Sequence, residues 1–380
     1  MQKFPTLYKK TATGKIQQWS VEVKDTTLHI NTGQVGGALT DFEDTIGEGK
    51  NIGRSNETTP EQQAIQEAIS RWEGQKKKGY VESEEDAMEG KVDPRFVAGG
   101  YKPLLAKSFD DFSHKIVYPA FVQPKLDGIR ACYDAGFLYT RTRKPIVTCS
   151  HILEQLEEMD VDKLRWDGEL YNHLFKEDFE KISSAVRKEK EESPYRKDIH
   201  YHIYDLNIEE PFEERIKYLD VLSDRIEEYK EKHGHTYVYT VKNHVVLNKE
   251  QVTELATSFQ NGGYEGAVVR NSQAVYQGKR SADLQKVKFF QDDEFEIVKI
   301  EDGRGKMKGR AARFVLKIND EYGERTFNAS PEGSLELLEE LFEKKDLLVG
   351  QLATVRFQGY TVKNHVPRIP KVKEIRDLNY

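Results

Sequence analysis

The segment Lys125-Leu126-Asp127-Gly128, followed two residues later by Arg130, contains the residue types that covalent nucleotide chemistry needs. A lysine beside an aspartate on a tight glycine turn is a candidate nucleophile toward a nucleotide phosphate. The pattern is short, and roughly one random chain in ten of this length contains Lys-x-Asp-Gly. Its significance therefore depends on the residues that follow it along the chain.

Three further cations are candidates to surround Lys125. A protonated lysine cannot attack phosphorus, and it becomes nucleophilic when neighbouring cations and partial desolvation favour its neutral form. Arg130 lies close in sequence, and Lys286 and Lys288 alternate along a strand predicted over residues 284–290. Because alternate residues of a strand point to the same face, we expect both lysines to project toward one site.

Two carboxylates and one aromatic ring lie on further predicted strands. Glu169 lies on the polar face of residues 166–170, and Glu265 opens a strand after a glycine turn. Tyr204 shares one side of the strand at residues 199–206 with two histidines. The carboxylates could bind a metal ion or a ribose, and the tyrosine could stack on a base. Taken singly, they could equally be surface acids and a core residue.

The elements that must position the nucleophile are short strands. Residues 121–123 read as a strand that runs into it, and residues 129–133 read as the next strand. The turn at residues 134–136 then leads into residues 137–142, which predicts an antiparallel hairpin. Gly128 would allow the backbone to approach a nucleotide closely.

Length and composition describe a highly charged chain of several domains. Its 380 residues are 37% hydrophobic and 32% charged, with a net charge of −7, and this length suits two or three domains. No apolar run approaches the ~20 residues that span a bilayer, and the first residues lack the apolar core of a signal peptide. Cys132 and Cys149 lie in strand-like runs, which favours reduced core residues and an intracellular protein.

The chain divides into three blocks, which predicts a multidomain α+β fold. The first block covers residues 1–80, with a helix at residues 61–74. Residues 81–94 carry six acids and one lysine, which predicts a solvated acidic linker. The second block covers residues 95–290. The third block covers residues 291–380. Its apolar and polar residues alternate as in strands, interrupted by one helix at residues 334–344, which suits a closed barrel of the OB type.

Basic residues concentrate in the last quarter of the chain. Residues 295–319 carry seven lysines and arginines against three acids, and residues 361–376 carry five against one. A basic turn between barrel strands is typical of contact with backbone phosphates. The candidate DNA-binding residues there are Arg304, Lys306, Lys308 and Arg310.

Taken in order, the segments KLDGIR, TRTRKPI, WDGELY, HIYDL, EGAVVR and LQKVKFF resemble the ATP-dependent DNA ligase branch of the covalent nucleotidyltransferases. The resemblance covers roughly residues 95–380. The same superfamily includes RNA ligases and mRNA capping enzymes. The resemblance implies a nucleotidyltransferase domain of ATP-grasp-like antiparallel sheets with helices, followed by an OB fold.

The resemblance also implies roles for individual residues. Lys125 would take AMP as a phosphoramidate. The residues that would contact the nucleoside part are Gln123 at the adenine edge, Tyr204 on the adenine ring, Glu169 at the ribose and metal, and Arg141 at the ribose or a DNA phosphate. The residues that would act near the phosphates are Glu265 with a metal ion, Lys286 and Lys288 on the α-phosphate, and Arg368 and Arg376 on the leaving pyrophosphate. Arg130 is a further candidate for binding the nucleotide.

The match to the family departs at two places. Arg143 stands where many relatives have glycine, and the last residues, 377–380, lack the terminal lysine of many members. The first departure concerns Arg143, and the second concerns the last motif of the family, which residues 366–370 and 373–377 resemble. The family resemblance itself does not depend on them.

The first block resembles a WGR domain, a module that touches DNA ends and nicks in other proteins. The likeness rests on Thr32-Gly33-Gln34-Val35-Gly36, on Ala64 and Ala68, and on the run from Lys76 to Tyr80. The tryptophan and arginine that give the module its name are Thr32 and Gln34 here, so its binding residues are not carried over. The lysines could contact DNA or form a solvated helix end.

The function implied is an ATP-dependent DNA ligase that seals 5′-phosphate/3′-hydroxyl nicks through lysyl-AMP and a DNA-adenylate. ATP would be the adenylyl donor and Mg²⁺ or Mn²⁺ the metal ion. We expect a monomer that acts on nicked duplex DNA in the cytoplasm of a bacterium or a phage-infected host, in replication or repair. The alternatives are an RNA ligase, a capping-type nucleotidyltransferase, or a nick- or end-binding protein without catalysis.

Overall fold

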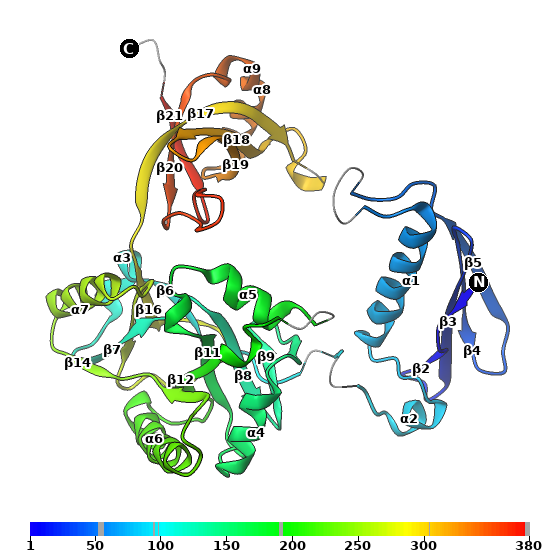
Figure 1. Ribbon diagram of the computed structural model, residues 1–380, viewed down its shortest axis with the longest axis horizontal. Helices are drawn as coiled ribbons and strands as arrows, with labels where there is room; N and C mark the ends of the chain where they lie inside the picture. The colour runs from blue at the N-terminus through cyan, green and yellow to red at the C-terminus, as the bar shows by residue number, and fades with distance from the viewer. Residues whose placement is uncertain (52–56, 94–95, 98, 190–192, 304, 377–380) are drawn as a thin grey trace.

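The computed structural model of the protein describes residues 1–51, 57–93, 96–97, 99–189, 193–303 and 305–376. It is a mixed α+β structure with three bodies, which we call the N-terminal unit (residues 1–93), the middle unit (residues 99–288) and the barrel unit (residues 291–376) (Figure 1). Within the described residues, no helix combines the length and apolarity that crossing a membrane requires.

The N-terminal unit is an antiparallel sheet covered by one long helix. Its strands are β1 (Gln2–Lys3), β2 (Leu7–Lys10), β3 (Ile16–Lys24), β4 (Thr27–Gln34) and β5 (Leu39–Thr45). The helix α1 (Pro60–Lys76) begins at Thr59, whose side chain forms a capping box with Gln62, and Pro60 occupies its first turn. Its buried stripe packs Ala64 and Ala68 against the sheet.

The acidic linker predicted at residues 81–94 is wrong for its first part. Ser83 caps a short helix, α2 (Glu84–Glu89), in which Ala87 is buried against Ile16 and Val81. The acids occupy the first turn, where they interact favourably with the positive end of the helix dipole. The charge pattern indicated a segment exposed to solvent, but Val81 and Ala87 pack this segment against the first sheet.

The middle unit consists of two sheets, each covered by helices on one face. The six-stranded sheet has the order β10 (Pro145–Ile146), β9 (Phe137–Thr140), β8 (Ile129–Asp134), β11 (Trp166–Tyr171), β12 (His200–Leu206), β13 (Val238–Thr240). The five-stranded sheet has the order β14 (His244–Val246), β7 (Ala120–Lys125), β15 (Gly266–Asn271), β16 (Arg280–Lys288), β6 (Leu105–Ser108). All neighbours pair antiparallel except β12 with β13 and β16 with β6.

The helices of the middle unit lie on the outer faces of the two sheets. They are α3 (Phe109–Phe112), α4 (Ser150–Glu158), α5 (Phe179–Arg187), α6 (Phe212–His233) and α7 (Lys249–Asn261). α4, α5 and α6 pack on the six-stranded sheet, and α7 packs on the five-stranded one. A smaller cluster with Cys132 and Leu284 joins the sheets at their inner faces.

The two cysteines are buried free thiols, as predicted. Cys132 lies on β8. Cys149 lies immediately before α4 and not in a strand, which corrects the expected element but not the expected burial.

The segment that contains Lys125 passes from one sheet to the other. β7 ends at Lys125 in the five-stranded sheet, and β8 begins at Ile129 in the six-stranded sheet. Gly128 lies in this crossing, where a Cβ atom would come within 2.4 Å of the carbonyl oxygen of Leu170. The glycine is therefore needed for close packing against β11. The predicted hairpin is present as β8 and β9, with Ala135 and Gly136 at positive φ in the turn.

The barrel unit closes five strands around one core. In barrel order they are β17 (Gln291–Asp302), β18 (Ala311–Asp320), β19 (Gly323–Pro331), β21 (Lys371–Arg376) and β20 (Leu352–Phe357). The predicted helix is α8 (Leu335–Glu343), capped by Ser334, and a second short helix that was not predicted, α9 (Lys345–Leu348), follows it. A register shift in β17 turns Lys299 outward, whereas Phe295 and Ile297 are buried.

Candidate active site

A cavity of about 260 Å³ lies between the two sheets of the middle unit. Eight of the predicted site residues line it: Gln123, Lys125, Arg130, Arg141, Glu169, Tyr204, Lys286 and Lys288. They come from both sheets, so the cavity exists only because the sheets face each other. Arg270 and Arg280, which were not predicted, line it as well.

The strand register explains how Lys125 and Lys288 come together. Gly266 on β15 pairs with Lys125 of β7 on one side and with Lys288 of β16 on the other. Glu265, the residue before β15, therefore lies between the two lysines, and its carboxylate pairs with both ammonium groups. A Cβ atom on Gly266 would lie 2.2 Å from the carbonyl oxygen of Val287, so only glycine allows this approach.

Glu265 is held as an anion in this arrangement. Burial acts to raise the pKa of its carboxyl, but the charges and hydrogen bonds of Lys125 and Lys288 outweigh burial and lower that pKa. Burial and the neighbouring charges of Lys288 and Lys125 lower the pKa of Lys286. The local structure thus concentrates cations and one shared carboxylate around Lys125, an arrangement suited to binding a phosphate.

Glu169 lies on the opposite sheet beside Tyr204. Its Oε2 atom is 3.5 Å from the hydroxyl of Tyr204, and its backbone pairs with Arg130 of β8. Burial raises the pKa of Glu169 from its ordinary value of 4.5 to about 7, although Lys125 and Arg130 act in the opposite direction. This carboxyl is therefore half protonated near neutral pH until a cation enters the cavity.

The raised pKa makes the stability of the protein depend on pH. Between pH 4.5 and pH 7 the native state keeps a proton on Glu169 that the unfolded chain has released, so the free energy of unfolding falls as pH rises. The shift corresponds to about 3 kcal/mol at most, since the side chain keeps some contact with water. The glutamine of Glu169→Gln cannot lose a proton, so this variant lacks the pH-dependent contribution of Glu169 to the free energy of unfolding. We expect the wild type to lose about 1–3 kcal/mol relative to Glu169→Gln between pH 5 and pH 8.

Urea unfolding of both proteins at pH 5, 6, 7 and 8 measures this difference. As pH rises, the urea midpoint of the wild type should fall steadily relative to that of the variant. Parallel midpoints at all four values would show that Glu169 titrates normally in the folded protein.

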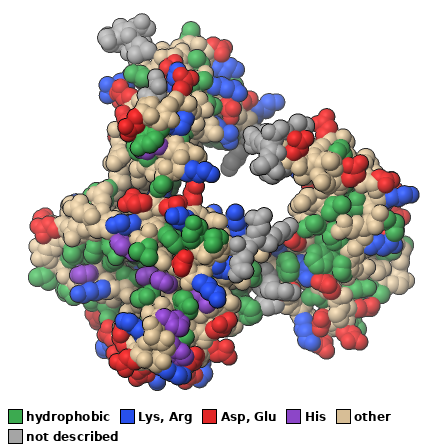
Figure 2. All heavy atoms as spheres, viewed as in Figure 1, with side chains coloured by type: hydrophobic (Ala, Val, Ile, Leu, Met, Phe, Trp, Pro, Cys, Tyr) green, Lys and Arg blue, Asp and Glu red, His purple; other side chains and the backbone are tan. Residues whose placement is uncertain are grey.

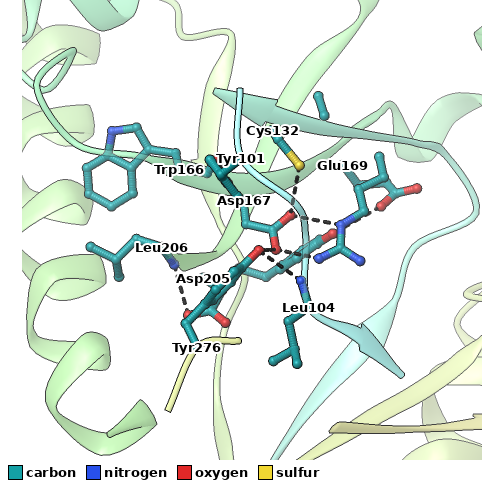
Figure 3. Close-up of polar contacts among 12 residues, drawn as sticks. Tyr101, Leu104, Cys132, Trp166, Asp167, Glu169, Asp205, Leu206 and Tyr276 are labelled. Carbon is teal, nitrogen blue, oxygen red and sulfur yellow. Dashed lines mark hydrogen bonds and ion pairs between the residues drawn. The ribbon is translucent and has the colours of Figure 1, made fainter. Parts of the chain in front are cut away.

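A buried carboxylate supports the floor of the cavity. Asp167 accepts hydrogen bonds from Arg130 (2.9 Å from Nε to Oδ1) and from the hydroxyl of Tyr276 (2.6 Å). Figure 3 shows Asp167 pointing toward Tyr276 and Cys132, with Glu169 further along the same strand. Asp167 thereby fixes the guanidinium of Arg130 beside Glu169.

A second buried carboxylate joins the two sheets. Asp205 at the end of β12 accepts from Nε of Arg215 on α6 at 2.7 Å and also pairs with Arg270 on β15. All three side chains are at most 3% exposed. Sequence reasoning missed this triad. A charged residue inside an otherwise apolar strand, as in HIYDL and EGAVVR, is the signal that could have found it.

The predicted face of β12 is confirmed. Tyr201 and Ile203 are fully buried on one side, whereas His200, His202 and Tyr204 lie on the other. The ring of His202 stacks on Tyr239 at 5.1 Å. Figure 2 shows histidine side chains gathered over the middle unit. Tyr204, at the inner end of this row, is the ring that reaches the cavity, and its carbonyl accepts a hydrogen bond from the carboxamide of Gln123.

The barrel unit brings one of its two predicted arginines to the site. Arg368 pairs with Asp127 at 2.7 Å, next to the nucleophile in sequence. Arg376 pairs instead with Glu294 at 2.6 Å on the barrel itself, and neither arginine lines the cavity. The two arginines of the last motif are therefore not equivalent in this arrangement.

The four candidate DNA-binding residues lie between β17 and β18. Arg304 lies outside the described residues, and so do residues 377–380 of the last motif. Lys306 belongs to the short turn Gly305–Met307. Lys308 is exposed, whereas Arg310 pairs with Glu339 at 3.0 Å.

Arg143 has a structural explanation. It sits at φ +67° in the turn between β9 and β10, a left-handed conformation in which glycine is the least strained residue. Its side chain donates to the carbonyl oxygen of Gly99 at 3.0 Å, so it is used structurally within the middle unit.

A lysine, a shared carboxylate and further cations lie between two facing sheets, which is the arrangement expected of a covalent nucleotidyltransferase. Comparison with protein-family models supports this class: residues 103–288 match the model described as the ATP dependent DNA ligase domain.

Known proteins extend the match beyond this domain. The chain is 25% identical over 416 residues to the DNA ligase of African swine fever virus (isolate Warthog/Namibia/Wart80/1980), covering 96% of this chain and 92% of the viral protein. It is 23% identical over 194 residues to the DNA ligase of Haemophilus influenzae, covering 51% of this chain and 66% of that protein. A solved structure described as a Lig E DNA ligase matches with a TM-score of 0.59 at 24% identity, covering 73% of this chain and all of the other. Residues 103–288 therefore form an ATP-dependent DNA ligase domain.

Proposed function

We propose that the protein seals nicks in duplex DNA that carry a 5′-phosphate and a 3′-hydroxyl, with ATP as the adenylyl donor. The observation that carries this proposal is the contact of Lys125 with Glu265 beside Lys286 and Lys288, in a cavity within a DNA ligase domain. Nucleophile and cations lie where a nucleoside triphosphate could present its α-phosphate.

In the first step Nζ of Lys125 attacks the α-phosphorus of ATP. A nitrogen–phosphorus bond forms, the bond to the β-phosphate oxygen breaks, and pyrophosphate leaves. Glu265, in contact with the ammonium group, is placed to take the proton that Lys125 must lose. Lys286 and Lys288 stabilise the charge that develops on the phosphate oxygens.

The next two steps use the same cavity. The 5′-phosphate oxygen of the nick attacks the phosphorus of the lysyl-AMP, the nitrogen–phosphorus bond breaks, and Lys125 regains its proton. The 3′-hydroxyl then attacks the activated 5′-phosphate, the phosphodiester forms, and AMP leaves.

The two carboxylates fit a divalent metal ion that arrives with ATP. Among the described residues, no group of three or more His, Cys, Asp or Glu side chains is arranged to hold a metal ion. Mg²⁺ usually binds through one or two carboxylates together with substrate phosphates. Glu169 and Glu265 would hold Mg²⁺ or Mn²⁺, which would supply charge stabilisation to the phosphates.

The domain assignment forms part of the proposal. We assign residues 95–290 to adenylation and residues 291–380 to an OB fold, supported by the five-stranded closed barrel with a helix between two of its strands. The barrel would swing between supporting the first step, as Arg368 does here, and gripping DNA in the later steps. The viral and bacterial DNA ligases that the chain resembles support a cytoplasmic place in a bacterium or infected host.

One assay tests the function. The protein is incubated with ATP labelled on its α-phosphate and then offered nicked DNA, nicked RNA and hybrid duplexes. We expect covalent label on the protein and its release as AMP when nicked DNA is sealed. Sealing of RNA alone would identify an RNA ligase, retained label without sealing a capping-type enzyme, and absence of label a binding protein.

The N-terminal unit is proposed to contact the DNA flanking the nick through a basic pocket. The polar residues that line this pocket of about 480 Å³ are three lysines, two threonines and two glutamines: Lys9, Lys10, Lys78, Thr11, Thr32, Gln17 and Gln75. No described carboxylate lines it. Lys10 donates to the carbonyl oxygen of Met88 at 3.0 Å, which leaves two further N–H groups for a phosphate.

Lys76, by contrast, is not available to DNA. It is 4% exposed, pairs with Glu82 at 2.6 Å and lies over the ring of Trp72 at 4.6 Å. The lysine run Lys76 to Lys78 is therefore neither uniformly a solvated helix end nor uniformly a binding surface. Lys76 serves the fold of this unit, and Lys78 reaches the pocket.

The pocket predicts a selective loss of DNA affinity. Lys10→Glu with Lys78→Glu should weaken binding to a nicked duplex about 10-fold or more and reduce the salt dependence by about two units, since two phosphate contacts are lost. Self-adenylylation without DNA should stay unchanged. The matched control is Lys24→Glu, an exposed residue of the same sheet outside the pocket. Equal losses in the double variant and the control would refute a specific site.

A further inference from the structure

The loop between β20 and β21 contacts residues around Lys125 at two points. Arg368, near its end, pairs with Asp127, and Gln358, at its start, reaches the pair formed by Glu265 and Lys288. The two ends of the loop are tied to each other by their backbones: the amide of Gln358 donates to the carbonyl of Arg368 at 3.1 Å, and the amide of Arg368 donates to the carbonyl of Gly359 at 2.8 Å. The loop therefore contacts the surroundings of Lys125 on two sides, through Asp127 and through the pair of Glu265 and Lys288.

The carboxamide of Gln358 can satisfy both of its neighbours at once. With its nitrogen toward Glu265, it donates to Oε1 at 3.2 Å, and its oxygen accepts from Nζ of Lys288 at 3.0 Å. The reverse orientation would set oxygen against oxygen and nitrogen against nitrogen. A neutral side chain with one donor and one acceptor is the group that fits between a carboxylate and an ammonium.

The remaining contacts of Glu265 and Lys288 show what Gln358 adds. Glu265 shares its carboxylate between Lys125 and Lys288, so a shift of either lysine moves the proton acceptor of the nucleophile. Gln358 belongs to the barrel unit and contacts both members of this pair. It also lines a second cavity, of about 290 Å³, together with Lys286 and Lys288. Its position therefore depends on the barrel being closed on the middle unit.

We propose that Gln358 is a positioning residue for the adenylylation of Lys125, which couples closure of the barrel to the placement of Glu265 and Lys288 around the α-phosphate. The proposal rests on the function proposed above. It assigns Gln358 to the first step alone, because the DNA-joining steps would take place after the barrel has swung away.

Separate measurement of the first and last steps tests this role. Gln358→Ala should slow self-adenylylation by ATP at least about 10-fold, expressed mainly in the rate at saturating ATP. Sealing of a pre-adenylylated nick without ATP should stay within about 2-fold of wild type. Gln358→Glu should be slower still in the first step, since its carboxylate faces that of Glu265. Gln351→Ala, a barrel glutamine whose side chain bonds to the carbonyl of Leu347, is the matched control.

The outcomes separate this proposal from the function it rests on. Equal slowing of both steps would mean a general structural role and would overturn the proposal, as would a wild-type adenylylation rate in Gln358→Ala. In either case the function stands as long as the wild type is labelled on Lys125 and seals nicks. Failure of the wild type to take label would overturn the function instead.

Discussion

Lys125→Ala is expected to abolish covalent labelling by ATP and to reduce nick sealing with ATP by at least ~10⁴-fold, the scale of loss when a covalent nucleophile is removed. The physical reason is that an alanine leaves Glu265 and the two late lysines in place but provides no atom to bond to phosphorus. Sealing of a pre-adenylylated nick should fall far less, because that step breaks and forms no bond to Lys125. Gel analysis of label on the protein and of ligated product measures both quantities.

Two further variants define what Lys125 contributes. Lys125→Arg keeps the positive charge beside Glu265 but is always protonated, so it should fold normally and take no label. Lys230→Ala, on the exposed surface of α6 and paired with Glu227, should label as the wild type does. Label on Lys125→Ala would mean that another residue is the nucleophile.

Local periodicity was enough to predict which side chains share one face of a strand. Alternation along a strand is a property of the backbone, so the shared face of Lys286 and Lys288, and that of His200, His202 and Tyr204, could be derived from spacing. The same applies to the hairpin of β8 and β9. These predictions needed no knowledge of which strands that are distant in sequence become neighbours.

Pairing between distant strands could not be predicted from spacing. That Gly266 lies between Lys125 and Lys288, and that Glu265 therefore contacts both, follows from the order β7, β15, β16 in the sheet. Glu265 was expected beside a metal ion, and its direct contact with the nucleophile was not foreseen. Gln358 was missed because a single glutamine in a loop carries no pattern.

In the N-terminal unit the burial of Lys76 was not predicted, because the charge of the lysine run was considered before its helical periodicity. Lys76 continues the spacing of Ala64, Ala68 and Trp72 at intervals of four residues, so it lies on the buried stripe of α1. The run of three lysines suggested a surface exposed to solvent, whereas the helical period places Lys76 on the buried face of α1. Its partners Glu82 and Asp93 come from the segment expected to be a linker.

Asp205→Ala is expected to destabilise the protein by about 3–5 kcal/mol, the cost of leaving a buried charge without its partner. Asp205 is the shared partner of Arg215 and Arg270, and it links β12 and α6 to the other sheet through β15. Arg215 keeps its hydrogen bonds to the carbonyl oxygens of Glu210 and Ala274, so Arg270 should bear most of the loss. Because the cavity is built from both sheets, ATP affinity should fall together with stability.

Urea unfolding distinguishes this buried triad from an ordinary ion pair. Asp134→Ala removes the partner of Arg165, which is 56% exposed, and should cost about 1 kcal/mol or less. Arg270→Met in an Asp205→Asn background should cost less than the two single changes together, because an apolar side chain then replaces a charge that has already lost its partner. A loss in Asp205→Ala no greater than that in Asp134→Ala would mean that the sheets are held together by apolar packing alone.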